Sequence, residues 1–120
     1  MAKGDDIQER LVGLAVAIVR VCDRLPETRT GGHIASQFLR SGTSPAPNYA
    51  EARGAESEKD FLHKLKVVLK ALNESLVWLA IIRRGELLAG SDLDGIVEEC
   101  TALCRITAAS INTMKAKMKL

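Results

Sequence analysis

Two carboxylates, Glu51 and Glu74, are the residues of this sequence best suited to acid–base chemistry, and Asn48 lies one helical turn before the first of them. A pair of carboxylates serves as general acid and base when its surroundings hold the two pKa values apart. The same residues also suit a structural role, in which each carboxylate binds a neighbour such as Arg40 or Asn48. The sequence leaves both interpretations open. It has no Ser-His-Asp or Cys-His spacing and no phosphate-binding glycine loop that would favour an enzyme.

The candidate metal ligands are three cysteines and two histidines: Cys22, His33, His63, Cys100 and Cys104. The spacing of Cys100 and Cys104 departs from the usual zinc patterns, and both lie on an apolar helical stripe, where cysteine packs as a small hydrophobe. We therefore expect Cys100 and Cys104 to be reduced, buried and free of metal, and we expect no cofactor. The odd number of cysteines, the lack of a CxxC pair and the lack of a signal-like start indicate a cytoplasmic protein.

Basic residues gather in two places, although the net charge of +2 is too small to require an anionic partner. One group lies in the third helical segment and the other ends the chain. The interpretation with least chemistry is a solvated helix face plus cations near a helix C-terminus. If the chain forms a symmetric ring, each modest basic patch is repeated and its phosphate contacts add up. The predicted nucleic-acid-binding residues are Lys64, Lys66, Lys70, Lys115, Lys117 and Lys119.

The elements that must position these residues are helices. Aromatic residues make up only 3% of the chain, while Leu, Ile, Val and Ala are abundant, which suits helices better than a β-sandwich. Helical periodicity runs over about residues 5–25, 32–52, 57–84 and 91–118. No linker or charge block divides these segments, so we expect one domain spanning residues 1–120. Short connections between such helices predict an antiparallel, up-and-down four-helix bundle.

Helix ends and apolar stripes can also be predicted. Ser57, followed by Asp60, resembles a capping box, and Ser91 is the expected N-cap of the last helix. The third helix carries one apolar stripe, made of Phe61, Leu65, Val68, Leu72, Leu76 and Leu79. The fourth carries an alternating seam, made of Leu93, Val97, Cys100, Cys104, Thr107, Ile111, Met114 and Met118.

Pro45 and Pro47 interrupt the second helix. Each proline removes a backbone donor and clashes with the preceding turn, so a kink or a break is expected there. The carbonyls of Ser41 and Thr43 then lose their helical partners, and Asn48 begins or continues a helical turn.

Two helices are more apolar than one small bundle requires. A helix needs an apolar stripe of only about 100° to face its own core. Val12, Val16 and Val19 lie outside the core stripe of the first helix, and the run from Leu76 to Ile82 is apolar without a break. Such surfaces predict more than one copy of the chain in the assembled protein. The apolar run from Leu11 to Val19 is too short to span a membrane, so no membrane association is expected.

The chain resembles the bacterial four helix bundle protein family, whose founding members are the intervening-sequence proteins encoded within large-subunit ribosomal RNA genes. The resemblance covers roughly residues 25–114, and the run RSGTSPAPNYAEA is its most specific part. Many members have Gly where this chain has Ala52, and Pro45 and Pro47 often differ, which bears on the kink. The family-motif residues in this chain are Gln37, Arg40, Ser44, Asn48, Glu51, Glu74 and Trp78.

The resemblance implies a left-handed bundle that assembles as a ring-like homopentamer, and a structural role for the motif residues. It does not imply an activity. A related branch, the accessory protein of diversity-generating retroelements, is a similar pentamer that binds a reverse transcriptase and nucleic acid.

Three functional hypotheses follow. The first is a non-catalytic homo-oligomeric scaffold, a pentamer, that docks a protein or nucleic-acid partner such as RNA, DNA or a nucleic-acid-processing protein. The second is an enzyme with a site at Asn48, Glu51 and Glu74. The third is a purely structural oligomer without affinity for polyanions. The lack of an assembled catalytic motif favours the first over the second.

Overall fold

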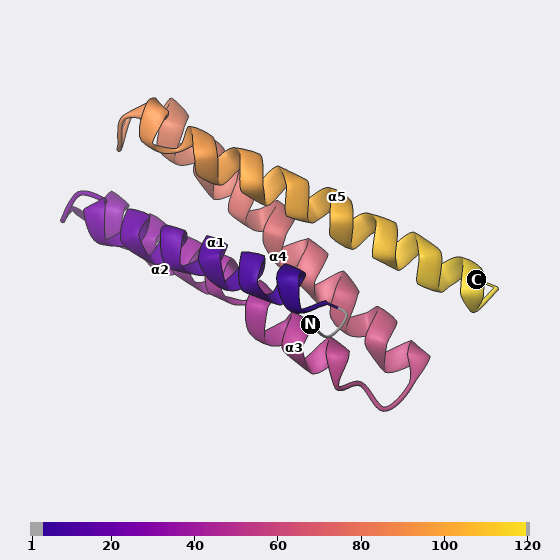
Figure 1. Cartoon of the computed structure of the whole chain (residues 1–120). Helices are drawn as coiled ribbons and strands as arrows, with labels where there is room; N and C mark the ends of the chain where they lie inside the picture. Colours follow the sequence, from indigo (N-terminus) through magenta and orange to yellow (C-terminus); the bar gives the residue numbers. More distant parts are fainter. Residues whose placement is uncertain (1–3, 120) are drawn as a thin grey trace.

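The structure, a computed structural model, describes residues 4–119 as helices and short connections, without a β-strand among them (Figure 1). The helices are α1 (Asp5–Arg24), α2 (Arg29–Thr43), α3 (Pro45–Arg53), α4 (Glu58–Arg84) and α5 (Asp94–Lys117), with a 3₁₀ turn, η1 (Gly90–Asp92), before α5. Together α2 and α3 supply the second helix of the bundle. The predicted all-α, antiparallel four-helix bundle is therefore confirmed.

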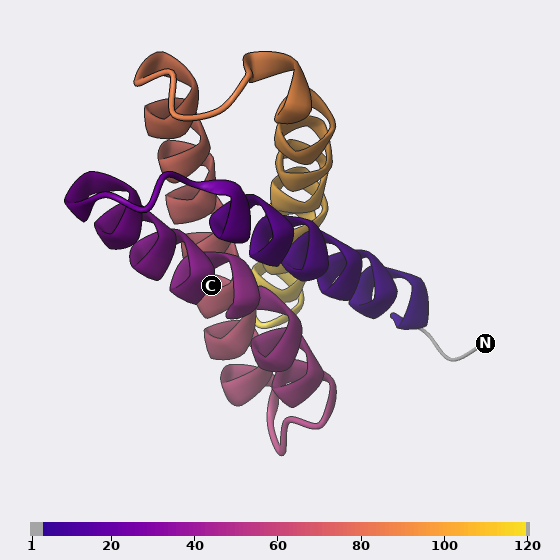
Figure 2. The ribbon, with the colours of Figure 1, turned by 90° about the vertical axis from the view of Figure 1, so that its left-hand side faces the viewer.

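The chain forms two helical hairpins, α1 with α2 and α4 with α5, and α3 continues from α2 towards the start of α4 (Figures 1 and 2). Helix α1 packs against α2, α3 and α5, and α4 also packs against these three helices. Helices α1 and α4 are thus diagonal to each other in the bundle. Their outward surfaces point in opposite directions.

The predicted interruption of the second helix falls at Ser44, between α2 and α3. Ser44 keeps helical dihedral angles, φ −72° and ψ −39°. The predicted kink or break is confirmed, and it follows from the N–H groups that Pro45 and Pro47 lack; α3 runs at an angle to α2 (Figure 2). Asn48 continues the helix as predicted, because its backbone N–H donates to the Ser44 carbonyl at 3.2 Å.

Helix starts follow side-chain caps at two positions. Ser57 accepts a hydrogen bond from the Asp60 N–H at 3.0 Å, as predicted for α4. Helix α2 starts at Arg29, three residues before the predicted Gly32, because Thr28 caps it through the Gly31 N–H at 3.0 Å. The predicted Ser91 cap is wrong. Ser91 lies inside η1, and α5 begins only at Asp94, without a side-chain cap.

The core is built from aliphatic side chains of all five α-helices, and most of the predicted stripes are buried. Of the two thiols predicted to be buried, Cys100 is buried, whereas Cys104 is only partly buried, which corrects the prediction for Cys104. The neighbouring Leu103 is fully buried instead. In α4, Leu62 is buried and Phe61 lies at the edge. A strict seven-residue repeat drifts by about 20° per heptad against a helix of 3.6 residues per turn, so neighbours exchange places along a long helix. No helix between residues 4 and 119 is long and apolar enough to cross a membrane.

Small residues set the closest approaches between helices. A Cβ added at Gly42 would lie 2.5 Å from the Ile18 Cγ2 atom, so only glycine allows α1 and α2 to pack this closely. The buried hydroxyls of Ser41 and Ser75 form a hydrogen bond of 2.9 Å between α2 and α4. Each polar group thereby has a partner inside the core, which offsets the free energy cost of burying it.

Candidate functional site

The most organised polar cluster lies on the seam between α2 and α4. Arg40 donates to both Glu74 and Gln37, the latter at 3.3 Å. The Trp78 Nε1–H donates to the same Glu74 oxygen, Oε2, at 3.0 Å. The rings of His33 and Trp78 are steeply inclined to each other, at 76°, with ring centroids 6.2 Å apart. The structure thus brings together four of the family-motif residues, and it adds His33 to them.

Electrostatics make Glu74 a poor candidate for an acid at neutral pH. The Trp78 hydrogen bond lowers the pKa of Glu74, and the charge of Arg40 lowers it further against the opposing effect of partial burial. A carboxylate with a lowered pKa is ionised at neutral pH and is a weak proton acceptor. The geometry therefore gives Glu74 a structural role, because its ion pair with Arg40 joins α2 to α4.

Glu51 and Asn48 lie apart from this cluster. The Asn48 amide donates to the Ser44 carbonyl at 2.9 Å and to the Ser44 hydroxyl at 3.0 Å, so it supports the start of α3. Glu51 is exposed and pairs with Lys64 at 3.4 Å. Lys64 and Glu74 are about 15 Å apart along α4 at 1.5 Å per residue. Glu51 and Glu74 consequently occupy separate places, each with its own cation.

The three thiols are free. The Cys22 thiol donates to the Ala35 carbonyl at 3.5 Å, and burial raises its pKa to about 11. The Cys100 thiol donates to the Leu72 carbonyl at 3.4 Å, and the Cys104 thiol donates to the Asn73 side-chain oxygen at 3.5 Å. The neighbouring Cys104 and burial raise the pKa of Cys100 above its usual range, while the neighbouring Cys100 lowers the pKa of Cys104. Among residues 4–119, no three Cys, His, Asp or Glu side chains lie close enough together to hold a metal ion.

The predicted nucleic-acid-binding lysines do not share one surface. Lys66 and Lys70 lie exposed on the outward side of α4, and the seven-residue spacing puts Lys59 in line with them. Lys64 faces α3 instead, where it binds Glu51. Lys117 pairs with Glu58 at 3.3 Å.

The remaining two predicted lysines and a missed arginine lie on or beyond α5. Lys115 is partly buried and Lys119 is exposed. Arg105 is also exposed, but the sequence interpretation did not select it because it stands alone among neutral residues.

Two apolar surfaces remain open to solvent. The α1 outer face consists of Val12, Val16 and Val19, of which Val16 is 43% exposed. The α4 outer face consists of Val77 and Ile81, of which Val77 is 58% exposed, and a hollow of about 680 Å³ lies beside it. Both faces belong to the regions in which the sequence showed more apolar residues than one bundle needs.

Comparison with known proteins agrees with this architecture. The family model of the 23S rRNA-intervening sequence protein matches residues 5–109. A crystal structure of a protein of unknown function from the S23 ribosomal protein family of Bacteroides thetaiotaomicron is 30% identical in sequence. The alignment covers 88% of this chain and 97% of that one, with a TM-score of 0.82. A search of curated proteins gives no match. The chain belongs to the 23S rRNA-intervening sequence protein family.

Proposed function

We propose that this protein is a non-catalytic scaffold, a homo-oligomeric ring of five copies that docks a partner in the cytoplasm. The observation that carries the proposal is the pair of exposed apolar surfaces, the α1 outer face and the α4 outer face. Because α1 and α4 are diagonal in the bundle, these faces point in opposite directions. Two different faces that bind each other between copies form a heterologous contact, which closes into a ring when the rotation allows it.

Energetics support association through these faces. At about 25 cal/mol per Å² of apolar surface, burying a few hundred Å² per chain is worth several kcal/mol before the cost of association. The number five rests on the resemblance to intervening-sequence proteins. The non-catalytic assignment is supported by the separation of Glu51 from Glu74, each of which binds a cation. The free cysteines fit a reducing compartment.

Light scattering coupled to size-exclusion chromatography tests the assembly. We expect a mass of five chains at micromolar concentration. A monomer would overturn the scaffold proposal, whereas a dimer or tetramer would overturn only the number of copies.

A second candidate function, contact with nucleic acid, is favoured by the basic half of the outward side of α4. Lys59, Lys66 and Lys70 are exposed there, and no ion pair joins any of them to another described residue. Unpaired cations release counterions when they bind phosphate, and a ring repeats the contribution in every subunit. Val77 and Ile81 follow these lysines along the same side of α4, so the lysines lie beside the proposed contact between copies.

Replacing Lys59, Lys66 and Lys70 together by Gln tests this contact. We expect weaker binding of single-stranded RNA or duplex DNA and a shallower dependence of the binding constant on salt, with unchanged helicity. The matched control replaces Lys64 and Lys117, which are already ion-paired on other surfaces. If the unaltered protein binds neither nucleic acid at low salt, the contact does not exist and the oligomer has no affinity for polyanions.

A further inference from the structure

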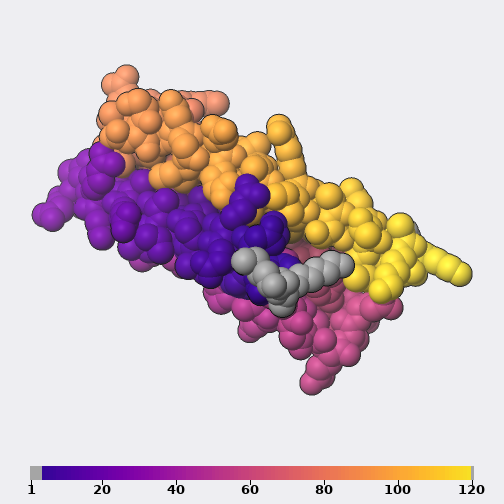
Figure 3. Space-filling model, in the orientation of Figure 1, coloured from indigo at the N-terminus to yellow at the C-terminus, as the bar shows by residue number. Residues whose placement is uncertain are grey.

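The α1 outer face is bounded by an acidic residue at each end. Val16 is its most exposed valine, and the exposed Glu9 and Asp23 lie seven residues before and after it. Seven residues are close to two helical turns, so these three side chains point in the same outward direction. We call Glu9, Val16 and Asp23 the α1 line. It belongs to α1, which reaches the surface, in indigo, on the side of the molecule that Figure 3 shows.

The α4 outer face is bounded by a basic residue at each end. Val77 is its most exposed residue, and the exposed Lys70 and Arg84 lie seven residues before and after it. We call Lys70, Val77 and Arg84 the α4 line. From residue 59 to residue 84, the exposed side chains of α4 include no acid. The two lines therefore share one pattern and carry opposite charge at both ends.

The charged ends of both lines are available for a contact between chains. Among residues 4–119, no ion pair or side-chain hydrogen bond joins Glu9, Asp23, Lys70 or Arg84 to another residue. The exposed Arg20 lies beside the α1 line, but it is not ion-paired with Asp23. An unpaired charge gives up no existing pair when it meets an opposite charge, and complementary charges on two surfaces favour their association.

The two lines also lie at similar heights in the bundle. Helices α1 and α4 run in the same direction along it (Figure 1), and α5 packs against both. Arg10 of α1 pairs with Glu99 of α5 at 2.6 Å. The next residue of α5, Cys100, donates to the Leu72 carbonyl of α4 at 3.4 Å. Arg10 and Leu72 thus lie beside the same turn of α5.

The other ends of these helices agree with this register. Arg24 of α1 pairs with Asp92 at 2.7 Å, and Arg83 of α4 pairs with Asp94, two residues further along. The stretch from Asp92 to Glu99 therefore lies between the same heights of α1 and α4. In this register each member of the α1 line lies within about one helical turn, 5.4 Å, of the height of the corresponding member of the α4 line.

Equal height is what a closed ring requires. Rotation about an axis moves a point around that axis without moving it along the axis. In a ring whose axis is parallel to the bundle, the α1 line of one copy meets the α4 line of the next only if both lie at the same height. Lines at different heights would give an open helical polymer instead.

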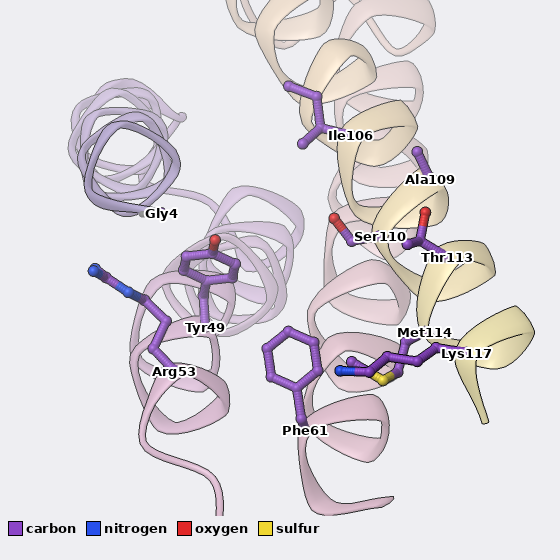
Figure 4. Close-up of a pocket in the computed structure, with 10 residues that line it drawn as sticks. All are labelled: Gly4, Tyr49, Arg53, Phe61, Ile106, Ala109, Ser110, Thr113, Met114 and Lys117. Carbon is purple, nitrogen blue, oxygen red and sulfur yellow. The ribbon is translucent and has the colours of Figure 1, made fainter. Parts of the chain in front are cut away.

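The groove of about 740 Å³ beside α3 and α5 (Figure 4) lies outside both lines. Its cations, Arg53 and Lys117, already pair with Asp5 and Glu58 within the chain. Unpaired charge therefore distinguishes the two lines from the groove as surfaces that meet a second copy.

We infer that the α1 line of one copy packs parallel against the α4 line of the next copy, so that two ion pairs enclose one apolar contact. The ion pairs join Glu9 to Lys70 and Asp23 to Arg84, and the apolar contact joins Val16 to Val77. The inference deepens the proposed ring of copies and rests on it. It also makes assembly sensitive to ionic strength, because salt screens charges at the edge of a contact.

Two double variants with the same net charge as the unaltered chain test the inference. Glu9→Lys with Lys70→Glu, the matched swap, exchanges the charges within one inferred pair. Glu9→Lys with Arg84→Glu, the crossed swap, places like charges in both pairs, which costs affinity. Light scattering over a series of protein concentrations, in about 0.1 M salt, measures the dissociation constant of the assembly. We expect the matched swap to stay within threefold of the unaltered protein and the crossed swap to assemble at least tenfold more weakly.

Two further measurements separate electrostatics from damage to the fold. Circular dichroism should show the helicity of the unaltered protein in both variants, which share the change at Glu9. In about 1 M salt the screening length falls to about 3 Å, so the crossed swap should regain most of its lost affinity.

Three outcomes would overturn the inference. Equal assembly of the two variants would show that the ion pairs do not form. Assembly of the crossed swap alone would require antiparallel helices. A mass that grows steadily with protein concentration would indicate an open polymer and not a ring.

Two comparisons separate this inference from the proposed function. If Val16→Arg blocks assembly while the two swaps assemble equally, the apolar faces meet and only the inferred ion pairs are wrong. If the unaltered protein is a monomer, the proposed ring and the inference fail together.

Discussion

At the scale of single residues, the small size of a glycine and two serines allows the helices to pack closely. Gly42 lies against the Ile18 side chain, and Ser41 and Ser75 bond to each other inside the α2–α4 contact. A larger residue at any of these positions would separate two helices along their length. The tightness of this half of the bundle therefore depends on three small side chains.

Gly42→Ala should destabilise the protein, because the added methyl group would lie 2.5 Å from the Ile18 Cγ2 atom. We expect a loss of about 1–3 kcal/mol in the free energy of unfolding, measured by urea denaturation. Gly13→Ala is the matched control. Gly13 has open space around it on α1, so alanine should stabilise the helix by about 0.5–1 kcal/mol. Equal effects of the two substitutions would contradict the close packing of α1 on α2.

Glu74 should give the protein a stability that depends on acid pH. The Trp78 hydrogen bond and Arg40 lower its pKa below the reference value of 4.5. A lowered pKa in the folded state stabilises the fold above the unfolded pKa, and this contribution disappears as the pH falls through the folded pKa. We expect the unfolding free energy of Glu74→Gln to fall less steeply than that of the unaltered protein as the pH drops below 4.5.

Trp78→Phe separates the hydrogen bond from the rest of this effect, because it keeps an aromatic ring and removes the N–H donor. Carboxyl ¹³C NMR should show that the pKa of Glu74 rises towards its usual value in this variant. A Glu74 carboxyl that titrates at or above 4.5 in the unaltered protein would show that its contacts with Arg40 and Trp78 do not form.

At the scale of elements, a serine caps a helix only where its backbone conformation lets the hydroxyl reach the first free N–H groups of that helix. Ser57 precedes α4 with extended dihedral angles, φ −147° and ψ 162°, and its hydroxyl accepts a hydrogen bond from the Asp60 N–H, three residues later. Ser91 lies in a 3₁₀ turn, where its side chain makes no cap bond to α5. The same residue type thus caps one helix and not the other.

Ser57→Ala should cost about 1 kcal/mol in the free energy of unfolding, because it removes the acceptor of the Asp60 N–H. Ser91→Ala should change the stability by less than about 0.5 kcal/mol, as for other exposed positions without a cap. Thermal or urea unfolding of the two variants measures both effects. A larger cost at Ser91 than at Ser57 would restore the cap expected from the sequence.

At the scale of the whole molecule, the diagonal placement of α1 and α4 leaves two different apolar surfaces exposed, the α1 outer face and the α4 outer face. A contact between unlike faces has a property that a two-fold contact lacks. One copy with a damaged α1 outer face and another with a damaged α4 outer face still retain one intact pair of faces between them. Mixing such copies therefore tests the symmetry of the proposed assembly.

Val16→Arg and Val77→Arg should each block assembly, since each places a charge in the middle of one apolar face. Mixed in equal amounts, the two variants should form a heterodimer and stop there, which light scattering detects. Arg in place of exposed Asn112 is the control and should leave the assembly intact. Two variants that stay monomeric when mixed would indicate a contact between like faces and would argue against a head-to-tail ring.

The sequence by itself determined the helices, the bundle and the break before α3. Apolar spacing of three and four residues is a local property, and Pro45 removes its hydrogen bond in any context. The excess of apolar residues at Val12, Val16 and Val77 was also visible in the sequence, and the structure leaves all three exposed. The family-motif residues on α2 and α4 were identified, although their pairing through Glu74 was not.

Only the tertiary structure decided how the helices are offset along their axes. Periodicity fixes the direction in which a side chain points around its helix, but it carries no information on axial register between helices. Register places Glu51 beside Lys64 and Glu74 beside Arg40, which separates the two carboxylates. It also places Asp5 of α1 beside Arg53 of α3, at 2.7 Å, and Arg10 of α1 beside Glu99 of α5, at 2.6 Å.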